Sequence, residues 1–237
     1  MKLLFADELN GKVNPKLFGI CLVVLDATKY RLLRENFHKL LKKSNWDHSV
    51  EFKGRYLFSR DPAGQRKTPE EMITLTTQII DWLKGESHQR GKIFCGYNTK
   101  GQSLDNYKYI LNGLVKRIPR CVNQGKNLCF VYYDETSILS NLLDQQQFAI
   151  EISANLEMRK YLLAEKNIQP ISSSNDSPGI IYADVLSHLC RWVIENPNQQ
   201  ELDVTDLIED RPNTQKKASI VHDIINRLKT KVLISIE

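Results

Sequence analysis

Apolar residues recur along this chain with two periods, one typical of strands and the other of helices. Continuous apolar runs predict strands at 3–6, 17–25, 92–97 and 127–133, and shorter ones at 168–172 and 232–236. Helical spacing of apolar residues predicts helices at 28–43, 69–85, 103–118, 142–165, 179–195 and 213–229. Because strands and helices alternate, the pattern predicts an α/β fold, with a mixed sheet that carries helices on its faces.

Local signals refine this picture at three places. The first two predicted strands are joined by a short turn containing Asn10-Gly11 and Asn14-Pro15, which favours an antiparallel hairpin. Thr68 and Glu71 form a capping box at the start of a helix. Between the predicted helix at 28–43 and this capping box, a short extended piece is expected around Glu51 and Phe52. A polar loop follows it, to residue 67.

Composition narrows the class of protein. The chain has 237 residues, 41% of them hydrophobic and 26% charged, which is ordinary for a globular protein. A net charge of +5 permits an anionic partner without demanding one. Because no apolar stretch reaches about 18 residues and no signal peptide is evident, we expect a cytoplasmic protein that does not enter a membrane.

The five cysteines, Cys21, Cys95, Cys121, Cys129 and Cys190, are scattered and form no C-x-x-C pair. Most of them lie in apolar segments, so we expect reduced, buried thiols that pack as small hydrophobic groups. The histidines are not spaced to complete a zinc site.

Two apolar strands end in the same acidic pair. Asp7 and Glu8 follow the first strand, and Asp134 and Glu135 follow the strand at 127–133. If these strands are parallel neighbours, Asp7 and Asp134 lie side by side, and such carboxylates suit hard cations such as Mg²⁺ or Mn²⁺. The alternative is that each aspartate belongs to a turn or caps a helix. A P-loop ATPase is excluded, because no glycine-rich G-x-x-x-x-G-K-[ST] segment is present.

A third acid, Asp184, interrupts the apolar helix at 179–195, and His188 and Arg191 lie one and two turns further along the same face. An aspartate in such a position needs a partner, a metal or an edge position. A salt bridge to Arg191 or His188 is the simpler interpretation. Glu51 is a fourth candidate acid.

The order of these features resembles the prokaryotic domain-of-unknown-function 3800 family. Asp7-Glu8-Leu9-Asn10 is similar to its D-E-S-G signature, although Gly11 comes one place late. The "EFKG" stretch, the strand ending in Asp134-Glu135, and "IIYADVLSHLCRW" with Ala183-Asp184 follow in the family's order. The resemblance covers roughly residues 2–193.

The resemblance implies an α/β ribonuclease H-like mixed sheet flanked by helices, in a single domain spanning 1–237 with 196–237 as a C-terminal extension. It implies that Asp7, Glu51, Asp134 and Asp184 hold two Mg²⁺ or Mn²⁺ ions for a nuclease or phosphodiesterase reaction on nucleic acid. Outer partners would be drawn from Glu8, Glu135, His188 and Arg191.

A polar loop from Arg55 to Lys67 mixes arginines with Tyr56 and Phe58, as expected for phosphate contact and base stacking, although both rings could equally be part of the core. Nothing in the sequence separates RNA from DNA or fixes the oligomeric state. Two rival functions stay open: a catalytically silent binding or interaction module, for example in a prokaryotic defence or mobile-element system, and a small-molecule phosphoesterase.

Overall fold

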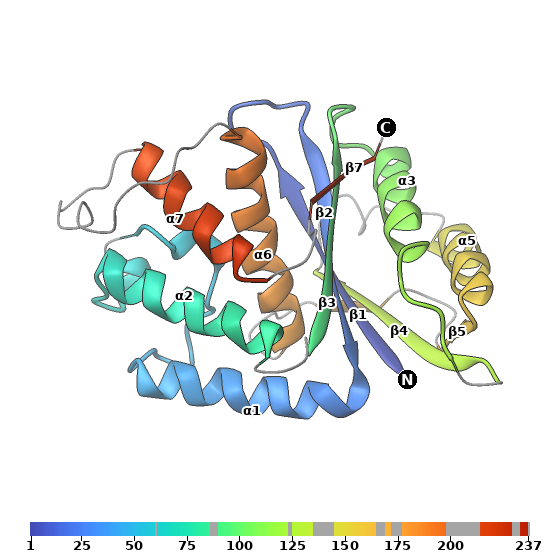
Figure 1. The fold of residues 1–237 in the computed structure, drawn as a ribbon, viewed down its shortest axis with the longest axis horizontal. Coiled ribbons are helices and arrows are strands. Elements are labelled where there is room, and N and C mark those ends of the chain that lie inside the picture. The colour runs from blue at the N-terminus through green and yellow to red at the C-terminus, as the bar shows by residue number, and fades with distance from the viewer. Residues whose placement is uncertain are drawn as a thin grey trace.

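The computed structural model describes residues 1–59, 61–85, 90–122, 125–134, 145–164, 169–171, 177–197, 214–228 and 233–236. Within these ranges the side chains of 134, 145–148, 169–171, 214–216 and 218 are not described. The chain forms a central twisted sheet with helices on both faces (Figure 1).

The sheet has the strand order β5-β4-β1-β2-β3-β7. A further strand, β6, pairs with β4, as β5 does. The strands are β1 (Lys2–Asn10), β2 (Phe18–Asp26), β3 (Gly91–Asn98), β4 (Asn127–Asp134), β5 (Tyr161–Leu163), β6 (Gln169–Ile171) and β7 (Leu233–Ser235). β2 is antiparallel to β1 and β3, whereas β4 is parallel to β1. Among the described strands, β2 alone therefore runs against the others. A mixed sheet with helices on both faces confirms the expected α/β fold class.

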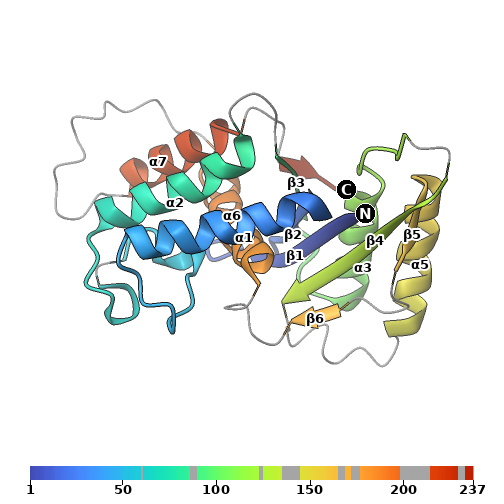
Figure 2. The same ribbon diagram turned by 90° about the horizontal axis from the view of Figure 1, so that it is seen from below.

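The helices form two layers. On one face lie α1 (Ala27–Lys43), α2 (Pro69–Lys84), α6 (Pro178–Glu195) and α7 (Thr214–Asn226). On the other lie α3 (Leu104–Val115) and α5 (Gln145–Met158), and Figures 1 and 2 show this division from two directions. A hydrophobic core lies on each face of the sheet, and alternate residues of β1 point into one or the other. Phe5 and Leu9 face α6, while Leu4 and Ala6 face α3.

Most predicted elements are confirmed. The hairpin of β1 and β2 is antiparallel, and Thr68 and Glu71 form both bonds of the capping box of α2. The C-terminal residues contribute directly to the fold, since α7 lies against α6 and β7 pairs with β3. Whether the chain is one domain with a separate extension at 196–237 stays a prediction.

Two expectations about element boundaries were wrong. Asp7 and Glu8 lie inside β1, because pairing with β2 continues as far as Asn10 opposite Phe18. The predicted helix at 142–165 ends at Met158, and the chain turns into β5 at Lys160, which has a left-handed conformation (φ 62°). The piece around Glu51 and Phe52 is not part of the sheet, and it leads through the extended Lys53 into a short 3-10 helix at Gly54–Tyr56.

No helix among the described residues is long and apolar enough to cross a membrane.

Candidate active site

Asp7 and Asp134 occupy neighbouring positions in the sheet. The parallel ladder between β1 and β4 runs from Lys2 opposite Cys129 to Ala6 opposite Tyr133. Asp7 and Asp134 are therefore the next residues on the two strands, one step beyond the last pair. β4 stops there, while β1 continues along β2. The side chain of Asp134 and all of Glu135 lie outside the described residues.

A serine of α6 joins Asp7 to this helix. Phe5 and Leu9 on either side of Asp7 pack into the core on the α6 face. The Oγ atom of Ser187 donates a hydrogen bond of 2.7 Å to Oδ2 of Asp7 and lies 2.9 Å from the main-chain carbonyl oxygen of Asp184. Ser187 is 5% exposed, so the contact is shielded from solvent. Asp7 and the turn of α6 that begins at Asp184 are thus in one neighbourhood.

Asp184 in turn holds the segment that contains Glu51. Its Oδ2 atom accepts a hydrogen bond of 2.7 Å from the main-chain N–H of Gly54. Gly54 lies so close to α6 that a Cβ atom would be 2.8 Å from both the Cα of Val185 and the Cβ of His188. A residue with a side chain would push the segment away from the helix. The glycine therefore brings the "EFKG" stretch against Asp184.

Positive charge faces these acids. Nζ of Lys53 lies 2.8 Å from Oε2 of Glu51, and both side chains are partly exposed. The pKa of Arg55 is raised mainly by its interaction with Tyr56, with smaller contributions from the carboxylates of Asp184 and Glu51. Arg55 itself is exposed. The acids therefore share their surroundings with the cationic side chains of Lys53 and Arg55.

His188 is neutral at physiological pH. Burial, helped by the nearby charges of Arg191 and Lys12, lowers the pKa of His188 to about 3. Its Nδ1 atom lies 3.0 Å from a guanidinium nitrogen of Arg191, and Nε1 of Trp192 lies 3.3 Å from Nε2. A neutral imidazole accepts at one nitrogen only, so the two donors compete for the ring.

Arg191 also reaches Glu195, with Nε 3.9 Å from Oε2. Burial lowers the pKa of Arg191, and the nearby carboxylates of Glu195 and Asp184 partly offset this lowering. The carboxylate of Glu195 accepts hydrogen bonds of 2.7 Å from the main-chain N–H groups of both Lys12 and Val13. The end of α6 thereby fixes the turn between β1 and β2.

Glu8 lies on the opposite side of the sheet from Asp7. Its Oε2 atom accepts a hydrogen bond of 3.3 Å from Gln102, and its charge adds to the burial that raises the pKa of Tyr107 on α3. Because Ser187 and Asp184 belong to the other face, Glu8 is not grouped with them.

Ser187, Gly54 and Glu195 are absent from the sequence-based candidates. Ser187 has one signal, its position three residues after Asp184 on the same helical face. Gly54 is the last residue of "EFKG", but only the packing shows why it must be glycine. Glu195 bonds residues 182 and 183 positions away, and no local pattern reveals such a contact.

Among the described residues, one group of three potential metal ligands has its ligand atoms all within 4.8 Å of one another. The group consists of three cysteines, Cys21, Cys95 and Cys190. The carboxylates of Asp7, Glu51 and Asp184 are more widely spaced than this. Carboxylate oxygens are the hard ligands that Mg²⁺ and Mn²⁺ take, and only the main chain of Asp134 is described, one position beyond the last pair of the β1–β4 ladder.

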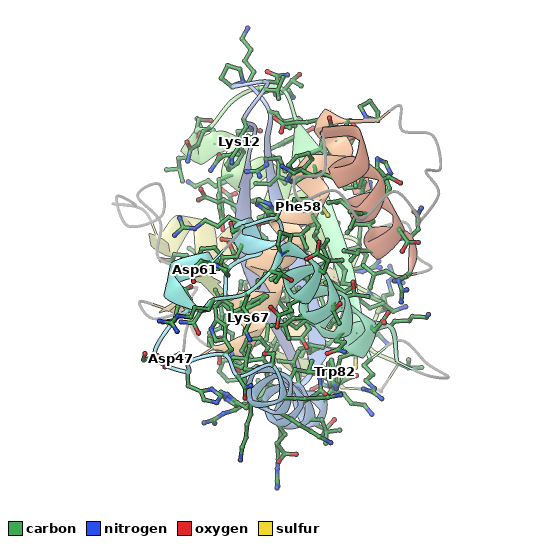
Figure 3. The ribbon with its side chains drawn as sticks, turned by 90° about the vertical axis from the view of Figure 1, so that its left-hand side faces the viewer. Lys12, Asp47, Phe58, Asp61, Lys67 and Trp82 are labelled. Atoms are coloured by element: carbon green, nitrogen blue, oxygen red, sulfur yellow. The ribbon has the colours of Figure 1, made fainter. Side chains whose placement is uncertain are left out.

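The loop at 55–67 lies beside α6 on one side of the molecule, where Figure 3 shows Phe58, Asp61 and Lys67. Its aromatic rings are partly buried: Phe58 packs edge-on against Trp192 with centroids 5.7 Å apart, and Tyr56 lies 6.2 Å from Trp46. The rings of Tyr56 and Phe58 therefore pack against the core, which is one of the two roles that the sequence left open for them. Arg55 stays exposed.

No protein-family model matches this chain, and no curated protein matches it. Among solved structures, the chain is similar to the crystal structure of ribonuclease H2 from Pyrococcus horikoshii OT3. The sequence identity is 13%, the match covers 98% of this chain and 100% of that one, and the TM-score is 0.37. A likeness this distant assigns no residue, and the resemblance to the domain-of-unknown-function 3800 family stays a prediction.

Proposed function

We propose that this protein is a divalent-metal-dependent nuclease or phosphodiesterase acting on nucleic acid. In this proposal Asp7, Glu51, Asp134 and Asp184 hold two Mg²⁺ or Mn²⁺ ions. The supporting observation is that Asp7 is tied to α6 by Ser187, one turn from Asp184, at the point where β4 ends beside β1. Asp7 and Asp184 are thus linked through α6, and the proposal adds Glu51 from the segment bonded to Asp184 and Asp134 from the strand beside β1.

Each contact in this region has a role in the proposal. The Ser187 hydroxyl fixes one oxygen of Asp7 against α6. The Gly54 N–H fixes one oxygen of Asp184 in the same way. Bound divalent ions would supply the activated water and stabilise the leaving oxygen of a phosphodiester. The chain itself contributes orientation and negative charge.

The choice of nucleic acid as substrate rests on charge. Arg55 is exposed within the electrostatic reach of Asp184 and Glu51, so a phosphate group near the acids would meet a guanidinium. The net charge of +5 also favours a polyanion. Affinity for nucleic acid is expected to fall as salt rises, because bound phosphates release counterions.

A catalytically silent binding module is the second candidate, and one observation favours it. Glu51 already pairs with Lys53 at 2.8 Å, and the carboxylates of Asp7 and Asp184 already accept hydrogen bonds from Ser187 and Gly54. An acidic cluster with such partners is stable without metal. Such a protein would bind nucleic acid by the same surface and leave it intact.

The deciding experiment combines calorimetric titration of Mn²⁺ and Mg²⁺ with cleavage assays on single- and double-stranded RNA and DNA. Wild type is compared with Asp7→Asn and Asp134→Asn, with Asp105→Asn as a control at an exposed site on α3. We expect saturable binding and metal-dependent cleavage in wild type and the control. Each site variant should lose at least about 100-fold in cleavage rate.

The outcomes separate the two candidates. Metal binding and cleavage that survive both site substitutions would refute the proposed carboxylate site. Nucleic-acid binding without metal binding or cleavage, on any of the four substrates, would establish the silent module instead.

A further inference from the structure

A second cluster of ligating groups lies in the core, beside the acidic region, since Cys21 pairs with Asp7 across the β1–β2 ladder. Cys21 on β2 and Cys95 on β3 are direct partners across the antiparallel ladder. Cys190 on α6 packs over them, and the three sulfur atoms all lie within 4.8 Å of one another. Each cysteine is fully buried within one hydrophobic core. The sequence separations, 74 and 95 residues, hide this cluster from any motif search.

The surroundings define the kind of ion that fits. Among the described residues the group contains three sulfurs and no histidine or carboxylate. Zn²⁺ in structural protein sites takes four ligands in a tetrahedron, so this donor set is one ligand short. Soft thiolates select Cu(I), which accepts fewer ligands than zinc does. Hard ions such as Mg²⁺ prefer oxygen and are excluded by the donor type.

We propose that Cys21, Cys95 and Cys190 form a buried three-sulfur site for one soft monovalent cation, Cu(I).

Binding is an exchange of protons for the metal ion. Each sulfur that ligates Cu(I) does so as a thiolate, so its sulfur–hydrogen bond is replaced by a copper–sulfur bond and its proton leaves to solvent. Copper stays Cu(I) throughout. No oxidant or reductant is consumed.

The site would act on the fold through α6. Cys190 lies one turn beyond Ser187, which contacts Asp7. A bound ion would link this helix to β2 and β3 with ligand bonds, because the folded chain presents the three sulfurs together and the unfolded chain does not. Copper binding should therefore raise the melting temperature. This inference does not rest on the proposed nuclease reaction, since the sulfur ligands and their metal are different from the carboxylates and theirs, even though Cys21 pairs with Asp7 across the ladder.

The test refolds the full-length, reduced protein without oxygen in the presence of Cu(I) buffered by a chromophoric competitor ligand. Thiolate-to-copper absorption in the ultraviolet reports the bound ion. Wild type is compared with Cys95→Ala and Cys190→Ala. The matched control is Cys129→Ala, which removes a fully buried cysteine from the other core.

We expect one copper ion per chain and a raised melting temperature in wild type and in Cys129→Ala. Cys95→Ala and Cys190→Ala should bind Cu(I) at least about tenfold more weakly, since replacing even a group that only hydrogen-bonds a metal ligand costs that much. X-ray absorption of copper-loaded wild type should show sulfur neighbours alone, a readout that holds even if a variant fails to fold.

Four results would overturn the proposal. One is the absence of saturable Cu(I) binding by wild type. Another is unchanged affinity in a folded Cys190→Ala variant. The third is a copper spectrum with nitrogen or oxygen neighbours. The fourth is displacement of Cu(I) by equimolar Zn²⁺.

Discussion

At the scale of single residues, the region around α6 combines charged and neutral groups whose state depends on burial. His188 shows this most clearly, because it lies between Arg191 and Trp192 and carries no charge at neutral pH. The ring therefore accepts a hydrogen bond at one of its two nitrogens and does not repel Arg191. Its proposed role as an outer partner of the acids depends on this neutral state.

The His188 environment predicts a pH dependence of stability. The pKa of His188 is about 3 in the folded protein, against an ordinary value of 6.5. Between these values the unfolded chain binds a proton that the folded chain does not, so the free energy of unfolding falls as pH falls from 6.5 towards 3. Urea unfolding curves across this range, for wild type and His188→Gln, measure the effect.

The difference between the two proteins isolates His188 from the other titrating groups. The decline in stability with falling pH should be smaller in His188→Gln, because this variant has no imidazole to protonate on unfolding. Parallel curves for the two proteins across the range would show that His188 does not have the assigned pKa.

At the scale of elements, α6 organises the candidate site. It contacts Asp7 through Ser187, the "EFKG" segment through Asp184 and Gly54, and the hairpin turn through Glu195. Each contact comes from a successive part of the same helix face. The position of α6 on the sheet therefore decides whether the acids belong together.

Replacing Gly54 with alanine tests the contact between the segment and this helix. The added Cβ would lie 2.8 Å from main-chain and Cβ atoms of α6, which are not free to move. We expect Gly54→Ala to lower the free energy of unfolding by about 1–3 kcal/mol, the usual cost of overpacking. Urea denaturation monitored by tryptophan fluorescence would measure it, since Trp46 packs on the neighbouring Phe52.

Gly125→Ala is the matched control, because an added Cβ there meets nothing within 4 Å. This variant should be as stable as wild type or slightly more so. Equal stability of Gly54→Ala and Gly125→Ala would mean that the segment is not held against α6.

At the scale of the whole molecule, the sheet joins residues from both ends of the chain. β1 and β2 begin the fold, and β7 closes the outer side of β3. Ile234 of β7 is buried opposite Gly96, and the side chain of Ile236 lies over Gly96 and Gly113. The last strand thus covers a strand edge that would otherwise offer unpaired main-chain groups.

Placing a charge at Ile234 should release this strand. We expect Ile234→Asp to lower the free energy of unfolding by about 1–3 kcal/mol, because an unpaired buried carboxylate is unfavourable. The uncovered edge of β3 should also cause self-association, which light scattering after size-exclusion chromatography would detect. Ser235→Asp changes the exposed neighbouring residue; if it were as damaging, the effect would come from added charge and not from loss of the buried contact.

Much of this fold follows from the sequence alone. Strong periodicity located the main helices and strands, and local chemistry located the Thr68 capping box and the hairpin turn. These features depend on residues close together in the chain, so the sequence contains the necessary information. The predicted ends of the elements were less accurate. β1, for example, extends past Asp7 because a partner strand, β2, continues to pair with it.

The candidate site needed the tertiary structure. The sequence singled out Asp7, Asp134 and Asp184 by residue type, but the parallel pairing of β1 with β4 and the packing of α6 on β1 decide their neighbours. The sequence likewise predicted buried cysteines without showing that three of them meet. Burial follows from local hydrophobicity, whereas contact between segments far apart depends on how the whole sheet and its helices close around one core.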